Sequence, residues 1–139
     1  MTTRADFIRS LLGAGHWPPH LNNFVALTCW MEAEGIVARF NPLATTQPAA
    51  GATNFNSTAV KNYTSLEQGL AMTLHTILNG RYNDVINSLV RHDSAYLTLG
   101  AVERSSWGTH FADLSSFIEN VRGDWSRYGW KLIPDAVPV

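Results

Sequence analysis

The sequence predicts a single α+β domain over residues 1–139, mostly helical, with a small irregular β-region directly after its longest early helix. Apolar residues recur at helical spacing before Glu34 and again after Ser65. Between these stretches, from Ile36 to Tyr63, Pro, Gly, Thr, Asn and Ser replace that periodicity. A chain that is 45% hydrophobic and 15% charged at this length can bury one core.

The first two helices are predicted from apolar spacing and from the residues at their ends. Arg4 to Leu12 reads as a short amphipathic helix that stops near Gly13. After an extended connector, Pro19 suits the first position of a second helix. That helix continues without interruption to Glu34, and Gly35 is the expected residue after its C-terminus.

The polar insertion and the later helices follow. Within residues 36–63, the segments Ile36 to Phe40 and Ala59 to Tyr63 are the best strand candidates. Thr64 to Gln68 has capping-box spacing, which predicts the start of a helix that runs to Leu78. Three further helices are predicted over Tyr82–Val90, Asp93–Gly100 and Leu114–Arg122.

Charge and composition exclude several classes of partner. A net charge of −1 argues against nucleic acid and against bulk attraction to anionic polymers. Asp6 and Arg9 interrupt the apolar residues near the N-terminus, so we expect no export signal and synthesis in the cytoplasm. The longest apolar run, Phe24 to Met31, is too short to span a bilayer, so we expect no integral membrane contact.

Glu34 is the candidate catalytic residue. The residues four and three positions before it are Trp30 and Met31, and Leu27 lies seven before, so Glu34 ends an apolar helical stripe. Burial against such a stripe disfavours the charged carboxylate and raises its pKa. A general acid for glycoside cleavage needs that shift because it must hold a proton near neutral pH.

Five short motifs carry a resemblance to a known family. They are Ala33-Glu34-Gly35, Asn41-Pro42-Leu43, Thr45-Thr46, Tyr63-Thr64-Ser65 and Trp107-Gly108-Thr109. In order and spacing, over roughly residues 21–109, the chain resembles the lysozyme-like muramidase and transglycosylase domains of actinobacterial phages and their hosts. The resemblance implies a lysozyme-like fold, cleavage of peptidoglycan between N-acetylmuramic acid and N-acetylglucosamine, and Glu34 as the acid. Ala44 departs from the family pattern, where a polar residue such as Asn is expected, so one sugar contact is expected to be missing.

The insertion supplies the expected substrate-binding residues. Hydroxyl and amide side chains suit hydrogen bonding to N-acetyl groups, and aromatic rings suit stacking on sugars. We expect the segment from Thr45 to Tyr63 to form one wall of a groove, with the later helices and Trp107 forming the other. The expected contacts are Thr45, Thr46, Gln47, Asn54, Asn56, Tyr63 and Trp107.

A second catalytic carboxylate is missing from the expected place. Glycosidases usually use two carboxyl groups, yet no Asp or Glu occurs between Gly35 and Leu66. Glu32 is two residues from Glu34, so on a helix the two point about 200° apart. Two mechanisms stay open: a lytic transglycosylase that uses only Glu34, and an inverting muramidase whose hydroxyls or amides position water.

The cysteine and the histidines do not favour a cysteine nucleophile or a metal site. Cys29 lies late in an apolar helix, which predicts a packing residue rather than a thiolate nucleophile. His16 and His20 have metal-like spacing, but the prolines between them prevent a shared helix. We expect no metal and no cofactor. We expect a monomer that acts on the bacterial cell wall, as a phage lysin or as part of a virion. The alternative is a non-catalytic wall-binding or virion structural domain.

Overall fold

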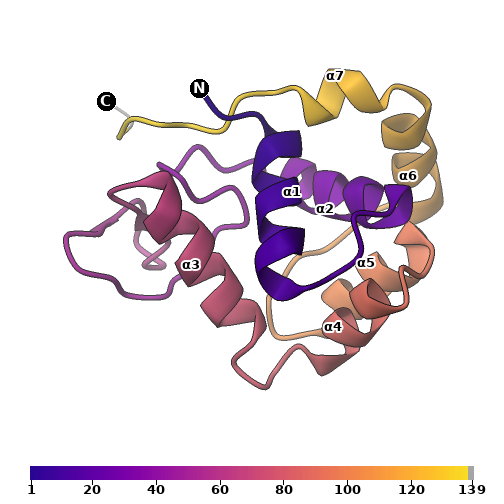
Figure 1. Cartoon of the computed structure of the whole chain (residues 1–139), viewed down its shortest axis with the longest axis horizontal. Helices are drawn as coiled ribbons and strands as arrows, with labels where there is room; N and C mark the ends of the chain where they lie inside the picture. Colours follow the sequence, from indigo (N-terminus) through magenta and orange to yellow (C-terminus); the bar gives the residue numbers. More distant parts are fainter. Residues whose placement is uncertain (138–139) are drawn as a thin grey trace.

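The computed structural model describes residues 1–137, and residues 138–139 of the predicted domain lie outside this range. Within that range the chain forms seven helices and one small sheet, which is a mostly helical α+β architecture (Figure 1). The helices are α1 (Arg4–Gly15), α2 (Leu21–Glu34), α3 (Leu66–Ile77), α4 (Asn83–Val90), α5 (Ala95–Arg104), α6 (Leu114–Gly123) and α7 (Trp125–Gly129). The strands are β1 (Thr53–Asn54) and β2 (Lys61–Asn62).

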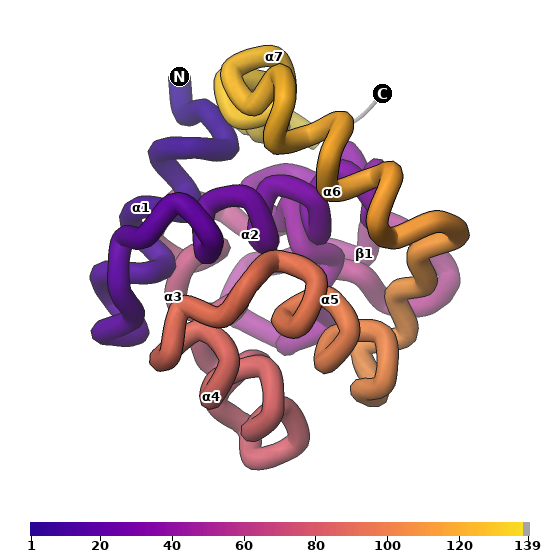
Figure 2. Tube along the Cα trace, turned by 90° about the vertical axis from the view of Figure 1, so that its right-hand side faces the viewer, coloured from indigo at the N-terminus to yellow at the C-terminus, as the bar shows by residue number. Residues whose placement is uncertain are grey.

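Helix α2 is the centre of the fold. It packs against α1, α5, α6 and α7, which surround it in Figure 2. Its residues from Val25 to Met31 are all buried, on every side of the helix. A helix that is apolar all round is stable only inside a core, so the uninterrupted apolar run becomes the innermost element.

The predicted signals are confirmed at the end of α2 and at the start of α3. At the start of α1, Thr3 forms a capping box with Asp6, which was not predicted. Ser65 accepts a hydrogen bond from the Gln68 amide at the start of α3. Gly35 ends α2 in the left-handed conformation, with φ 58°. The start of α2 differs slightly, because His20 caps it and the helix begins at Leu21 rather than Pro19.

The insertion holds a shorter sheet than expected. Lys61–Asn62 is a strand within the predicted segment 59–63, and it pairs antiparallel with Thr53–Asn54. The predicted strand over Ile36 to Phe40 is wrong. The amide of Arg39 donates to the side chain of Asn62, and that of Phe40 donates to the Pro134 carbonyl. Phe40 also has φ 52°, which no strand accepts.

Asn41 holds the rest of the insertion together. Its amide nitrogen donates to the carbonyls of Thr45 (2.9 Å) and Lys61 (2.8 Å). Its side-chain oxygen accepts from the Thr45 amide at 3.0 Å. Asn41 is completely buried, so these bonds satisfy backbone groups that water cannot reach. The Asn-Pro-Leu motif is therefore a structural feature of this loop.

The two ends of the described chain meet. Thr3 forms a β-bridge with Leu132, and the Ile133 amide donates to the Thr2 carbonyl at 2.9 Å. Ile133 is buried in the core. The last segment therefore belongs to the fold, and the sequence patterns did not predict helix α7 that leads into it. Among residues 1–137 no helix is long and apolar enough to cross a bilayer.

Candidate active site

Glu34 is the last residue of α2, at the point where the chain turns into the insertion. Its side chain is half-buried, and Oε1 accepts a hydrogen bond from the Thr109 hydroxyl at 2.5 Å. The predicted apolar stripe is present, because Leu27, Trp30 and Met31 are each 0–1% exposed. The carboxyl group therefore emerges from the core beside a hydroxyl donor from a distant loop.

The surroundings of Glu34 favour its protonated form. Burial raises the pKa of this carboxyl above the ordinary 4.5, while the donors Thr109 and Trp30 act in the opposite direction. The Trp30 indole N–H is buried and has no partner at normal hydrogen-bond geometry among the described residues. Its effect on Glu34 is thus that of a nearby dipole rather than of a formed hydrogen bond. Desolvation is the larger effect, which is the direction a general acid requires.

The loop that carries Thr109 is anchored at both sides. Glu103, near the end of α5, accepts a hydrogen bond from the Phe111 amide at 2.8 Å and lies 3.2 Å from His110 Nδ1. The Ser105 hydroxyl accepts from the Trp107 amide at 3.3 Å. Phe111 is itself buried in the core. Thr109 is therefore held in place by its neighbours. The motif Trp107-Gly108-Thr109 is the sequence signal for this loop, although it predicts only Trp107 as a contact residue.

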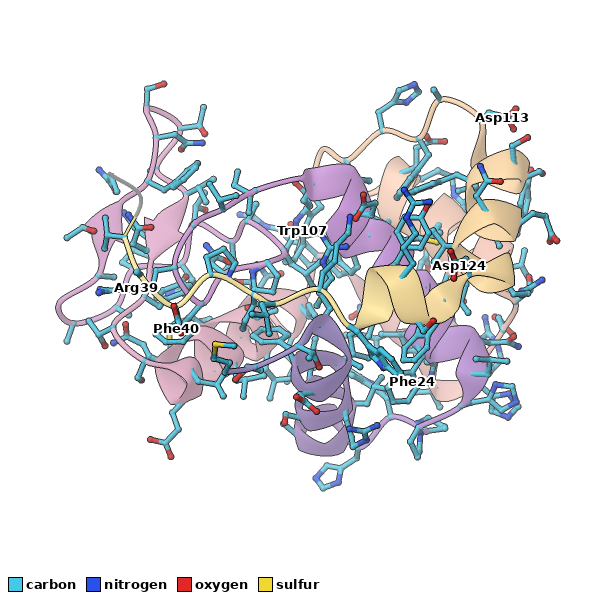
Figure 3. All side chains as sticks on the ribbon, turned by 90° about the horizontal axis from the view of Figure 1, so that it is seen from above. Phe24, Arg39, Phe40, Trp107, Asp113 and Asp124 are labelled. Carbon is cyan, nitrogen blue, oxygen red and sulfur yellow. The ribbon has the colours of Figure 1, made fainter. Side chains whose placement is uncertain are left out.

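Trp107 joins the insertion to the helical core. Its indole Nε1 donates to the Leu43 carbonyl at 2.9 Å. Its ring meets the edges of Trp30 at 4.8 Å and Tyr82 at 5.1 Å between ring centroids. Figure 3 shows it between the insertion and α2. Trp107 remains half-exposed, so part of the ring is free to meet a ligand.

A groove lies between the insertion and the later helices. It is a depression of about 240 Å³. Two exposed polar side chains, Thr46 from the insertion and Arg81 from the segment before α4, line it. Its lining residues are Ala44, Thr45, Thr46, Thr76, Arg81, Tyr82, Ser106 and Trp107. Trp107 and residues after the insertion line one side of the groove as expected, but the insertion contributes only residues 44–46, and Glu34 is not among the lining residues.

The expected role of Tyr63 in stacking on a sugar does not fit the structure. Its ring is completely buried, and its hydroxyl donates to the Gln47 carbonyl at 2.7 Å. Burial raises the pKa of this phenol to about 12. Tyr63 therefore packs the insertion from within and offers no face to a ligand.

The remaining residues predicted to contact the substrate differ in how exposed their side chains are. Thr46 and Asn54 are exposed, and Gln47 and Asn56 are half-exposed. The Asn56 side chain accepts from the Val60 amide and so shapes a turn. Asn54 accepts from Lys61 Nζ at 2.5 Å across the β1–β2 pair. Neither asparagine lines the groove, so the structure does not bring them together with Thr45, Thr46 and Trp107.

Thr45 is 2% exposed, and its hydroxyl lies 2.5 Å from that of Thr76 on α3. The same oxygen accepts a hydrogen bond from the Gln47 amide at 3.2 Å. Its polar atoms are thus already paired within the protein. Thr45 contributes to the floor of the groove, and a ligand would meet Thr46 first.

Three other carboxylates are engaged elsewhere. Glu32 forms ion pairs with Arg4 and with Lys131, the latter at 3.0 Å, on the side of α2 away from Thr109. Asp93 pairs with Arg91 at 3.0 Å. Asp113 caps α6, and Figure 3 shows it far from the insertion. The prediction that Glu32 and Glu34 face different ways is confirmed.

Cysteine and histidine residues occupy structural positions. Cys29 is completely buried, and burial raises the pKa of its thiol to about 12, as expected for a packing residue. His20 caps α2 and stacks on His92 with 4.3 Å between ring centroids. In the described part of the chain, no three His, Cys, Asp or Glu side chains group as a metal site would require.

Comparisons with protein-family models, with curated proteins and with solved structures find no match for this chain.

Proposed function

We propose that this chain is a lysozyme-like peptidoglycan hydrolase that uses Glu34 as its general acid. The observation that carries the proposal is the half-buried Glu34 carboxyl, whose pKa is raised and which Thr109 orients. The loop that supplies Thr109 also supplies Trp107 to a groove with exposed hydroxyls. A half-buried carboxyl with a raised pKa, in a domain that also has a polar groove with an aromatic wall, suits cleavage of a glycan strand.

Thr109 decides which oxygen of Glu34 serves the substrate. Because its hydroxyl donates to Oε1, the proton of the neutral acid belongs on Oε2. In the proposed reaction Oε2 gives this proton to the glycosidic oxygen between N-acetylmuramic acid and N-acetylglucosamine. The bond from C1 to that oxygen then breaks, and the sugar acquires oxocarbenium character.

A single carboxyl favours lytic transglycosylation over hydrolysis. A covalent glycosyl-enzyme needs a second carboxylate about 5 Å from the first. Glu32, Asp93 and Asp113 are engaged elsewhere, and Glu103 is bonded to the Phe111 amide and lies against His110. In the proposed second step the C6 hydroxyl of the muramic acid attacks C1, and the ionised Glu34 takes the hydroxyl proton. The product is an anhydro sugar, water is not consumed, and Glu34 returns to its protonated state.

Digestion of purified peptidoglycan followed by mass spectrometry tests the proposal. Glu34→Gln keeps the shape of the side chain and removes the transferable proton, so we expect at least a hundredfold loss of rate. Glu32→Gln is the matched control on the same helix and should keep most of the activity. Glycan ends from transglycosylation lack one water relative to those from hydrolysis.

Three outcomes would contradict parts of the proposal. A Glu34→Gln protein that keeps more than about a tenth of the rate rules out Glu34 as the acid. Hydrolytic ends with inverted configuration would instead identify the muramidase mechanism. Binding of peptidoglycan without any cleavage by the unmodified protein would identify a non-catalytic wall-binding domain.

A further inference from the structure

Arg81 is a charged side chain without a protein partner in the groove. It precedes α4, is exposed, and lines the groove together with Thr46. Within residues 1–137 its guanidinium forms no ion pair and no side-chain hydrogen bond, and only its backbone amide is bonded, to Asn79. Four other arginines of the chain do have carboxylate partners: Arg4, Arg9, Arg91 and Arg122. Arg81 is therefore available to an external anion.

The groove around Arg81 is otherwise neutral. Its other lining side chains are hydroxyls, aromatic rings and Ala44, so Arg81 supplies the charge on this surface. A second depression of about 200 Å³ adjoins it, and Arg81 and Tyr82 line both. This second depression adds Arg104, which likewise has no ion pair in the described chain, and one acid, Asp84. The local charge is thus positive on a chain whose net charge is −1.

We propose that Arg81 binds a carboxylate of the peptidoglycan strand and makes the groove prefer peptidoglycan to chitin. A guanidinium presents a planar pair of N–H donors that matches the two oxygens of a carboxylate. Chitin is built of neutral N-acetylglucosamine, whereas peptidoglycan carries carboxylates on its stem peptides and on lactyl groups freed of peptide. The inference rests on the proposed function, because it takes the groove to be the glycan site.

The test measures binding in the Glu34→Gln background, so that no ligand is consumed. Co-sedimentation is measured with intact peptidoglycan, with amidase-stripped glycan strands and with chitin. Arg81→Met removes the charge and keeps most of the side-chain length. The matched control is Arg127→Met, an exposed arginine of α7 at the end of the molecule opposite α4 (Figure 1).

We expect Arg81→Met to weaken peptidoglycan binding about tenfold, as expected for losing hydrogen bonds to a charged group. Binding to chitin should stay unchanged, and Arg127→Met should leave all three ligands unaffected. A loss confined to intact peptidoglycan assigns the carboxylate to the stem peptide. A loss that persists on stripped strands assigns it to the lactyl group.

Equal weakening on chitin and peptidoglycan, or no weakening at all, would overturn the role of Arg81. Failure of peptidoglycan to bind the Glu34→Gln protein at all would overturn it as well. A different result would contradict the proposed function. A protein that binds peptidoglycan through Arg81 but never cleaves it would contradict the proposed reaction and support the role of Arg81 in binding. Conversely, if Arg81→Met cleaves peptidoglycan normally and still prefers peptidoglycan to chitin, the proposed enzymatic function stands and the role of Arg81 is rejected.

Discussion

The contact between Thr109 and Glu34 joins residues 75 positions apart through a single hydrogen bond. Its effect on the acid is opposite to that of burial, since a donor to the carboxylate stabilises the charged form. The pKa of Glu34 is raised overall because desolvation is the larger effect. Thr109 thus moderates the acid and fixes its orientation.

Thr109→Val should raise the pKa of Glu34 further, because the isosteric side chain cannot donate. For a general acid, the high-pH limb of kcat/KM reports loss of the catalytic proton. We therefore expect this limb to move to higher pH in Thr109→Val and to stay in place in Thr109→Ser, which keeps the hydroxyl. A drop in rate with no movement of the limb would show that Thr109 serves only the fold.

The conformation of Ala44 gives a reason to expect Asn at this position that does not involve a sugar contact. Its φ is 60°, in the left-handed region that Asn and Gly adopt more readily than Ala. The backbone conformation is thus by itself a reason to expect Asn at this position, independent of any ligand. Ala44 also lines the groove, so a larger side chain there would lie at the groove surface.

Ala44→Asn should increase the free energy of unfolding by about 0.5–1 kcal/mol, because Asn tolerates the left-handed conformation at lower cost. Urea unfolding measures the change. Ala112→Asn is the control, since Ala112 is exposed and its φ is not positive. If Ala44→Asn is neutral or destabilising, strain at this turn is not relieved by Asn.

At the scale of the elements, helix α3 packs closely on the turn at Phe40, at the position of Gly69. A Cβ on Gly69 would lie 2.0 Å from the Phe40 carbonyl oxygen. Phe40 is held by a bond from its amide to Pro134, so it has little freedom to move away. The absence of a side chain at Gly69 thus sets how closely α3 packs on the insertion.

Gly69→Ala should lower the free energy of unfolding by more than about 2 kcal/mol, because the new methyl group overlaps backbone atoms. Gly13→Ala on α1 is the matched control, since a Cβ there meets nothing within 4 Å. That control should gain up to about 1 kcal/mol from helix propensity. Similar effects of the two substitutions in urea unfolding would mean that α3 can shift away from Phe40.

At the scale of the whole molecule, Glu32 connects the two ends of the described chain. It lies on α2 and pairs with Arg4 on α1 and with Lys131 after α7. Partial burial acts to raise its pKa, but hydrogen bonds from Arg4 and Lys131 and their positive charges hold the pKa below the ordinary 4.5. Glu32 and Glu34 are therefore shifted in opposite directions, although two residues separate them on one helix.

Replacing each glutamate with Gln should change the pH dependence of Tm in opposite senses. The lowered pKa of Glu32 means that its stabilisation is present above the unfolded pKa and is lost as pH falls through the folded pKa. Glu32→Gln should thus lower Tm by about 3 °C at pH 7 and by less at pH 3. The raised pKa of Glu34 means that stability is lost as pH rises through the folded pKa, so Glu34→Gln should raise Tm at pH 7 and not at pH 3. If Tm changes in the same sense in both variants as the pH is varied, the opposite pKa shifts of Glu32 and Glu34 are contradicted.

Local patterns in the sequence were enough for the helical elements and for part of the site. Helix periodicity and capping residues depend on neighbours three or four positions away, so α1, α2 and α3 could be predicted, together with the end of α2 and the start of α3. The same reasoning placed Glu34 at the end of a buried stripe and Cys29 inside the core. The polar insertion has no such periodicity, so one of its two expected strands was wrong. Helix α7, which lies outside the insertion and has only five residues, was also missed.

Only the tertiary structure decided which residues surround Glu34 and which line the groove. The contact of Thr109 with Glu34 spans 75 residues, and that of Trp107 with Leu43 spans 64. Such pairs arise when helices and loops pack around α2, and no local spacing encodes them. Burial decided the rest, because Tyr63 and Thr45 satisfy their hydroxyls inside the protein while Arg81 finds no partner among residues 1–137. A polar side chain can meet a ligand only where packing leaves it unpaired and exposed, and this depends on the whole fold.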